Sequence, residues 1–223
     1  MPRVGAPVQV GLVETMRAKD GRVPWLGRHL TRLRVSVAAL GAREPADDLA
    51  ELVRFAVGHR DRVVRVQLTD GHAEITTREL KVEPAINVVV AGEVHHPYPH
   101  KTTEREQFAR ALANARRIGA YDAVLLAADG IVAEGTAWNL FWWENGSLCT
   151  PAADLGILPG LGRARIMELT DVKEERVPVG AIAGRSLFIV NAVRGIVEVG
   201  VFDGAPVPRD PRTAELSFAF WPD

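Results

Sequence analysis

Four short segments contain residue types that can do chemistry. His29 and Arg32 stand three positions apart, so on a helix both side chains share one face. Lys101, one of only four lysines, becomes nucleophilic where burial or nearby cations lower its pKa. Glu134 directly precedes Gly135, between two predicted strands. Glycines around Gly160 lead into a predicted helix, and the first N–H groups of a helix favour binding of an anion. Taken singly, each segment also fits a solvated surface, and residue type alone favours that interpretation for Arg32 and Lys101.

Apolar residues at helical spacing predict four helices, two of which position Arg32 and Lys101. Three of these helices are followed by a glycine, the residue that most readily ends a helix in the left-handed conformation. We expect the N-cap of the helix after Lys101 at Thr102 or Thr103. The predicted helices span 26–40, 47–57, 103–118 and 160–169, and the glycines are Gly41, Gly58 and Gly119.

Turn chemistry predicts antiparallel sheet around the helices. Five Asx-Gly pairs lie between apolar runs, and such pairs supply the positive φ that tight hairpin turns need. Two of the pairs join the arms of predicted hairpins. The pairs begin at Asp20, Asp70, Asp129, Asn145 and Asp203, and strands are expected at 4–13, 63–69, 73–77, 86–91, 140–143 and 147–150.

The order of the elements divides the chain into two parts. Strands, two helices and a hairpin make up the first part, and strands dominate the second. We therefore expect an α+β fold with a small N-terminal α+β domain over 1–82 and a larger, mostly β domain over 83–223. A break near 81–84 separates the two domains.

Composition is typical of a soluble globular protein. The 223 residues are 47% hydrophobic and 25% charged, with 27 Lys and Arg against 28 Asp and Glu. The net charge of −1 disfavours nucleic-acid binding through bulk electrostatics. No apolar stretch reaches the roughly 20 residues of a membrane-spanning helix, and 4–13 lacks the cleavage site of a signal peptide. The single cysteine, Cys149, permits no intrachain disulfide, and we expect a cytoplasmic protein.

The order and spacing of the four segments closely resemble those of the class IV aminotransferases, fold type IV enzymes that depend on pyridoxal 5′-phosphate (PLP). The segments contain His-x-x-Arg-Leu, Lys-Thr-Thr, Glu-Gly-x-x-x-Asn-Leu-Phe and Ile-Leu-Pro-Gly. The resemblance runs from about Gly11 to Gly204. It implies the two-domain D-amino acid aminotransferase-like fold, a small-molecule amino substrate and a homodimer.

The resemblance also implies a role for each matching residue. Lys101 matches the lysine that carries the cofactor and then acts as general base. Glu134 matches the carboxylate that keeps the pyridine nitrogen of the cofactor protonated, so that the ring can accept electrons. The phosphate ligands would be the Arg32 side chain, the backbone amides of Leu161 and Gly162, and a further residue at Ala192.

Within this family, the details most resemble aminodeoxychorismate lyase. The run from Lys101 to Arg105 is similar to the Lys-Thr-Thr-Asn-Arg run frequent there, and Asn139-Leu-Phe-Trp142 resembles lyase sequences. We therefore expect a lyase that releases 4-aminobenzoate and pyruvate in folate precursor synthesis. The alternative is a branched-chain or D-amino acid aminotransferase, and a remote alternative is a catalytically silent binding protein on the same fold.

Departures from the family pattern bear on these alternatives. Gly162 and Ala192 stand where many members have hydroxyl side chains, so two phosphate hydrogen bonds of about 1 kcal/mol each are missing. Glu104 stands where Asn is usual. The residues before Gly11 do not match the Asp-Arg-Gly-Phe stretch that lines the substrate side in many relatives.

Residues near Lys101 are candidates for substrate contact. His96 and Tyr98 either line the substrate entrance or belong to a polar loop. Arg105 either holds a substrate carboxylate or simply begins its helix. The loop interpretation is favoured for His95. No carboxylate or cysteine completes a metal site with these histidines, so no metal is expected.

Overall fold

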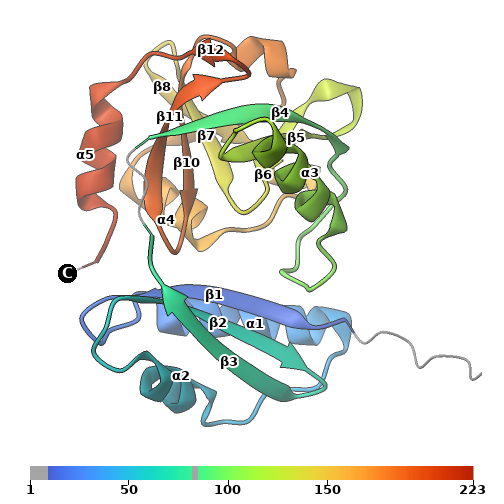
Figure 1. The fold of residues 1–223 in the computed structure, drawn as a ribbon, viewed down its shortest axis with the longest axis vertical. Helices are drawn as coiled ribbons and strands as arrows, with labels where there is room; N and C mark the ends of the chain where they lie inside the picture. Colours follow the sequence, from blue (N-terminus) through green and yellow to red (C-terminus); the bar gives the residue numbers. More distant parts are fainter. Residues whose placement is uncertain (1–9, 82–84, 223) are drawn as a thin grey trace, which may run out of the picture. The chain divides into compact units, whose positions relative to one another are not determined.

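The structure is a computed structural model and describes residues 10–81 and 85–222 (Figure 1). Its contacts divide the chain into two compact units. The first unit holds the residues up to Leu80 together with His100–Glu104, and the second holds Lys81–Pro99 and the residues from Arg105 onward. The predicted boundary between residues 82 and 83 lies outside the described residues.

The first unit is a three-stranded antiparallel sheet, in the order β1-β2-β3, with two helices packed on it. The alternation of side chains along each strand decides which residues meet the helices. On β1, Leu12, Met16 and Ala18 join the apolar faces of α1 and α2 in one core. The elements are β1 (Leu12–Ala18), α1 (Leu26–Leu40), α2 (Leu49–Val57), β2 (Arg62–Thr69) and β3 (His72–Glu79).

The second unit is built on a mixed sheet in the order β6-β5-β4-β11-β10-β7-β8-β9, with β12 paired to β11. β4 is parallel to both β5 and β11, and β8 is parallel to β9. The strands are β4 (Ile86–Val94), β5 (Asp122–Leu126), β6 (Val132–Gly135), β7 (Asn139–Glu144), β8 (Ser147–Pro151), β9 (Val172–Glu175), β10 (Ser186–Asn191), β11 (Gly195–Phe202) and β12 (Ala205–Pro206). The helices are α3 (Glu106–Arg117), α4 (Leu161–Leu169) and α5 (Pro211–Ala219), with 3-10 turns at Ala128–Gly130, Ala153–Leu155 and Val179–Ile182.

This sheet curls so that its two edges meet. At the β6 edge the Val132 N–H donates to the Val177 carbonyl at 3.0 Å, and Ile131 forms an antiparallel bridge with Pro178, just after β9. Trp142 and Leu140 of β7 lie in the largest buried cluster of the unit. α3 covers β4 and β5, α4 contacts β10, and α5 contacts β11 (Figure 1). The helices of this unit therefore lie against the curled sheet.

Most of the predicted elements are confirmed. All four predicted helices form, and the first has the predicted bounds. Both hairpins and the strand from Ile86 form, and the first residue of each Asx-Gly pair has a positive φ. The predicted strand over 4–13 is corrected, because the observed strand runs from Leu12 to Ala18; the part before Val10 lies outside the described residues. α5 was not predicted, although Asp210 caps it and Pro211 begins it.

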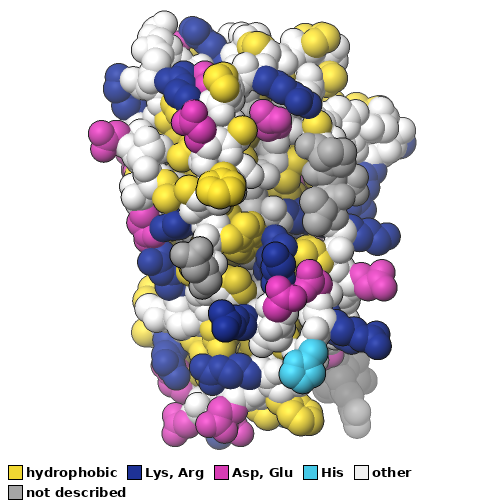
Figure 2. All heavy atoms as spheres, turned by 90° about the vertical axis from the view of Figure 1, so that its left-hand side faces the viewer, with side chains coloured by type: hydrophobic (Ala, Val, Ile, Leu, Met, Phe, Trp, Pro, Cys, Tyr) yellow, Lys and Arg dark blue, Asp and Glu magenta, His cyan; other side chains and the backbone are white. Residues whose placement is uncertain are grey.

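Within residues 10–81 and 85–222, no helix combines the length and the apolar character needed to cross a membrane. Figure 2 shows one face of the molecule, on which basic, acidic and hydrophobic side chains are interspersed. This mixture agrees with the net charge of −1.

Candidate active site

Glu14 is a buried carboxylate at the centre of a polar cluster in the first unit. It lies on β1 between Leu12 and Met16, so strand alternation turns it to the core face. Its Oε2 lies 2.7 Å from both His29 Nδ1 and Arg32 Nη2, and Oε1 accepts a bond from Arg32 Nε at 2.8 Å. The predicted common face of His29 and Arg32 is therefore confirmed, and both residues serve one carboxylate.

The charges in this cluster follow from burial and pairing. Burial would raise the pKa of Glu14, but the hydrogen bonds from His29 and Arg32 and the Arg32 charge outweigh it and lower the pKa to about 2. Burial lowers the pKa of His29, although its bond to Glu14 opposes that shift. The arginine fork is thus held by an ionised carboxylate, through two of the five N–H donors of a guanidinium.

Lys101 lies on a short segment that pairs with the start of β1. The Val13 N–H donates to the Lys101 carbonyl at 2.7 Å. The Gly11 N–H donates to Thr103 Oγ1 at 3.0 Å, and the Thr103 N–H donates to the Gly11 carbonyl at 2.8 Å. The predicted threonine N-cap of α3 is therefore wrong, because Thr103 bonds to the β1 segment and Arg105 stands at the N-cap position. The Lys101 backbone is fixed in the unit that holds Arg32.

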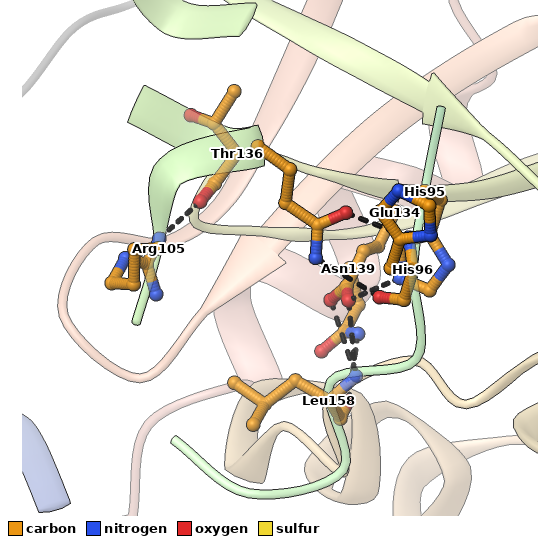
Figure 3. A network of polar contacts seen from close by, with 8 residues as sticks. His95, His96, Arg105, Glu134, Thr136, Asn139 and Leu158 are labelled. Atoms are coloured by element: carbon orange, nitrogen blue, oxygen red, sulfur yellow. Dashed lines mark hydrogen bonds and ion pairs between the residues drawn. The ribbon is translucent and has the colours of Figure 1, made fainter. Parts of the chain in front are cut away.

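Glu134 is a second buried carboxylate, and it lies in the second unit on β6 (Figure 3). Its side chain is 4% exposed, and Oε1 lies 3.0 Å from His95 Nε2. The Leu158 N–H is 3.2 Å from each of the carboxylate oxygens. The residue is therefore a fixed buried group and not a hairpin-end glutamate in solvent.

The loop that carries Leu158 is itself fixed. The Asn139 side-chain amide donates to the Leu158 carbonyl at 3.1 Å, and the Gly160 N–H donates to the same oxygen at 2.8 Å. A Cβ at Gly160 would lie 2.0 Å from Asn139 Oδ1, so a side chain at this position requires the loop to shift. The Asn-Leu-Phe and Leu-Pro-Gly motifs therefore meet beside Glu134.

α4 begins directly after this loop, with Leu161 and Gly162 as its first residues. The N–H groups of a first helical turn have no carbonyl partner within the helix, which makes such a turn suited to an anion. A Cβ at Gly162 would lie 3.0 Å from Asn191 Cα, so packing accounts for the absent hydroxyl. This close contact places Asn191, the residue before Ala192, beside the start of α4. Three predicted phosphate ligands thus gather in the second unit, whereas Arg32 belongs to the first.

The three predicted substrate contacts occupy different environments. Tyr98 is 6% exposed and packs edge-to-face on Phe108, with ring centroids 5.0 Å apart. Arg105 lies over both rings and donates to the Thr136 carbonyl. The His96 side chain is exposed. The structure gives Arg105 and Tyr98 a role in packing, and their contact with substrate stays a prediction.

Sequence reasoning assigned no role to Glu14. It favoured a polar loop for His95, which is wrong, because the His95 side chain is buried against Glu134. A charged residue on the core face of an amphipathic strand, between Leu12 and Met16, was an available signal for Glu14. His95 had no such signal, because its partner Glu134 lies 39 positions away in the sequence.

The α+β fold of two units, with its curled mixed sheet, is that of the PLP-dependent enzymes of fold type IV. The chain belongs to the class IV amino-transferase family, whose model matches residues 11–201. Enzymes of this family use PLP. The predicted family, fold class, enzyme class and cofactor are therefore confirmed.

The similar proteins are named for two different activities, branched-chain aminotransferase and 4-amino-4-deoxychorismate lyase. A provisionally named branched-chain-amino-acid aminotransferase of Rickettsia typhi is 28% identical over 201 residues, which cover 76% of this chain and 69% of that protein. The structure of a provisionally named 4-amino-4-deoxychorismate lyase is 25% identical with a TM-score of 0.81, covering 95% of this chain and 90% of the other. The branched-chain aminotransferase of the archaeon Thermoproteus uzoniensis, solved with norvaline, shares the fold, with a TM-score of 0.86 at 22% identity and coverages of 94% and 84%.

The residues in place fit PLP. Glu134 supplies a buried carboxylate for a ring nitrogen, and the start of α4 supplies N–H groups for a phosphate. Lys101 supplies an amine for an aldehyde. Within the part of the chain that the structure describes, no group of three or more His, Cys, Asp or Glu side chains is placed to hold a metal ion.

Proposed function

We propose that this protein is a PLP-dependent enzyme in which Lys101 carries the cofactor and Glu134 pairs with its ring nitrogen. The burial of Glu134 between two hydrogen-bond donors is the observation that carries the proposal. A buried carboxylate costs free energy unless it is compensated, and the fixed anion has a clear use beside a protonated pyridine nitrogen. Bound PLP supplies an electron sink for bonds at the carbon that bears the substrate amine.

The other residues then have defined tasks. Arg32, held in place by Glu14, and the N–H groups of Leu161 and Gly162 bind the phosphate dianion. The region of Ala192 contributes backbone groups, because alanine carries no hydroxyl. With PLP bound, the free Lys101 amine would act as the general base that removes the proton from the carbon bearing the substrate nitrogen.

The finer proposal is a lyase that converts 4-amino-4-deoxychorismate to 4-aminobenzoate and pyruvate. The run from Lys101 to Arg105 supports it, as does the likeness to a solved structure named for that activity. After proton removal by Lys101 the freed electron pair forms a ring double bond and the neighbouring C–O bond breaks. The enolpyruvate that leaves then takes up a proton and becomes pyruvate. The ring becomes aromatic, so no second substrate is needed. We also propose a cytoplasmic homodimer, which the family resemblance supports.

The second candidate is an aminotransferase for branched-chain or D-amino acids. The curated relatives named as branched-chain aminotransferases favour it. In that reaction Lys101 would act first as proton acceptor and then as proton donor, and bound PLP would supply the chemistry that moves the amino group to a 2-oxo acid. The two candidates share the proposed cofactor-binding residues. They differ in whether the electron pair freed by proton removal expels a leaving group or is protonated again.

One experiment separates these reactions. The PLP-supplied protein is incubated with 4-amino-4-deoxychorismate without any 2-oxo acid, and pyruvate is measured. Release of pyruvate and 4-aminobenzoate supports the lyase, with Lys101→Ala as the inactive control. Turnover only with an amino acid and a 2-oxo acid identifies the aminotransferase. A folded, PLP-supplied protein inactive in both assays would contradict the proposal and favour a binding protein.

A further inference from the structure

His95 follows the end of β4 and is one of the most enclosed polar side chains of the second unit. Its side chain is 0% exposed. The His95 backbone N–H donates to the Leu126 carbonyl of β5 at 2.8 Å. The imidazole meets the edge of the Phe108 ring at a centroid distance of 6.3 Å. The His95 side chain is thus enclosed, with Phe108 and Glu134 among its contacts.

The following residue is clamped to α3, which restricts the backbone of His95. The His96 N–H donates to Gln107 Oε1 at 2.6 Å, and the Gln107 amide donates back to the His96 carbonyl at 2.9 Å (Figure 3). The Tyr98 N–H donates to the Gly156 carbonyl at 2.7 Å. The imidazole therefore meets Glu134 from a backbone that is held on both sides.

The hydrogen bonds indicate which proton His95 carries. An ionised Glu134 can only accept, so the proton shared at 3.0 Å must sit on His95 Nε2. Among the described residues, His95 Nδ1 is a buried nitrogen without a hydrogen-bond partner. A protonated Nδ1 would leave a charged N–H unsatisfied against an apolar wall, which is costly. The neutral imidazole with its proton on Nε2 fits both observations.

We propose that His95 is a positioning residue for Glu134, an inference that rests on the proposed function. His95 fixes one carboxylate oxygen and adds no positive charge. The oriented carboxylate of Glu134 can then accept a hydrogen bond from the protonated ring nitrogen of bound PLP. An arginine in the same place would compensate part of that charge, as Arg32 does at Glu14.

The test compares two amide substitutions in the PLP-loaded protein. His95→Gln places an amide nitrogen near the position of Nε2, whereas the shorter His95→Asn does not reach Glu134. With ring-15N-labelled PLP, 15N NMR reports the protonation of the pyridine nitrogen. We expect a protonated nitrogen in the wild type and His95→Gln, and loss of that proton in His95→Asn. The dissociation constant for PLP should rise roughly tenfold in His95→Asn only. Identical ring protonation and affinity in all three proteins would overturn the proposal.

A second measurement needs no substitution. Histidine 15N shifts of the wild-type holoenzyme should show a neutral His95 with its proton on Nε2. An imidazolium, or a proton on Nδ1, would overturn the proposal. Failure of the wild type to bind PLP would instead contradict the proposed function. The proposal for His95 and the proposed function are therefore contradicted by different results.

Discussion

Glu14 and Glu134 are both buried strand glutamates, one in each unit, but their partners differ in charge. Glu14 receives a two-pronged bond from the Arg32 guanidinium and one from His29. Glu134 receives bonds from the His95 imidazole and from the Leu158 backbone. The first carboxylate is thus paired with a permanent cation. The second accepts bonds from a backbone N–H and from an imidazole that we propose to be neutral.

This difference indicates different tasks for the two carboxylates: Glu14 positions Arg32, whereas Glu134 is proposed to bind a ligand. A carboxylate paired with a guanidinium fixes the arginine and stabilises the fold, but much of its charge is compensated. A carboxylate fixed by neutral donors keeps its charge for a ligand that brings its own proton. The contrast agrees with the proposed pairing of Glu134, and not Glu14, with the cofactor ring, which the family resemblance implies.

The largest effect is expected from Glu134→Gln. An amide preserves the size of the side chain but cannot stabilise a protonated pyridine nitrogen. Turnover should fall on the order of a hundredfold or more, while the free energy of unfolding changes by less than about 1.5 kcal/mol. Steady-state kinetics and urea unfolding measure the two quantities. A variant that keeps more than a tenth of wild-type turnover would contradict the proposed pairing of Glu134 with the cofactor ring.

Glu14→Gln should act mainly on stability. The substitution leaves Arg32 beside a buried neutral amide, and breaking a buried pair in this way costs about 3 kcal/mol or more. Glu106→Gln is the matched control, because Glu106 is 90% exposed and should change the unfolding free energy by no more than about 0.5 kcal/mol. Urea unfolding at neutral pH provides the comparison. Equal stability of the two variants would show that the Glu14 pair contributes nothing.

The contribution of Glu14 should also depend on pH. Its folded-state pKa of about 2 is below the ordinary value of 4.5, so its stabilisation is complete above pH 4.5 and is lost as the pH falls toward 2. The shift corresponds to about 3 kcal/mol. The difference in unfolding free energy between the wild type and Glu14→Gln should therefore shrink by about that amount across this window. A difference independent of pH would contradict the lowered pKa.

A smaller effect is expected from Gly160→Ala, which tests how firmly the backbone donor to Glu134 must be held. The new methyl group collides with Asn139 and displaces the loop that carries Leu158, at a cost of about 1–3 kcal/mol. The affinity for PLP should weaken as well. Gly92→Ala in β4 is the control, because no atom lies within 4 Å of the added Cβ. If both alanine variants bind PLP equally, the loop geometry is not needed.

The smallest effect is expected from Arg105→Gln. Loss of the bond to Thr136 and of the packing on Tyr98 should lower the unfolding free energy by about 1 kcal/mol and leave KM within about threefold of the wild type. Arg110→Gln is the exposed control on the same helix. A KM at least tenfold higher with unchanged kcat would assign Arg105 to substrate binding instead.

Local signals predicted much of the fold. Asp70-Gly71 and Asn145-Gly146 fixed their hairpin turns because few other residue pairs tolerate the backbone they require. Apolar periodicity placed α1 over its full length. α3 begins later than predicted because Thr103 pairs with the β1 segment, a long-range contact that no local pattern reveals.

The site could be predicted only in part. Lys101, Glu134 and Arg32 stood out because their motifs occur in a recognisable order. Their supporting partners did not, since the His95–Glu134 contact depends on how β4 and β6 are placed on either side of β5. The neutral or charged character of each partner becomes visible only with the hydrogen bonds in place.

Covalent trapping of the cofactor tests directly whether Lys101 carries PLP. The protein is incubated with excess PLP, reduced with borohydride and digested, and the peptides are mapped by mass spectrometry. We expect a phosphopyridoxyl group on Lys101 and none on Lys19, Lys81 or Lys173. A folded protein without the adduct on Lys101 would contradict the proposed role of Lys101.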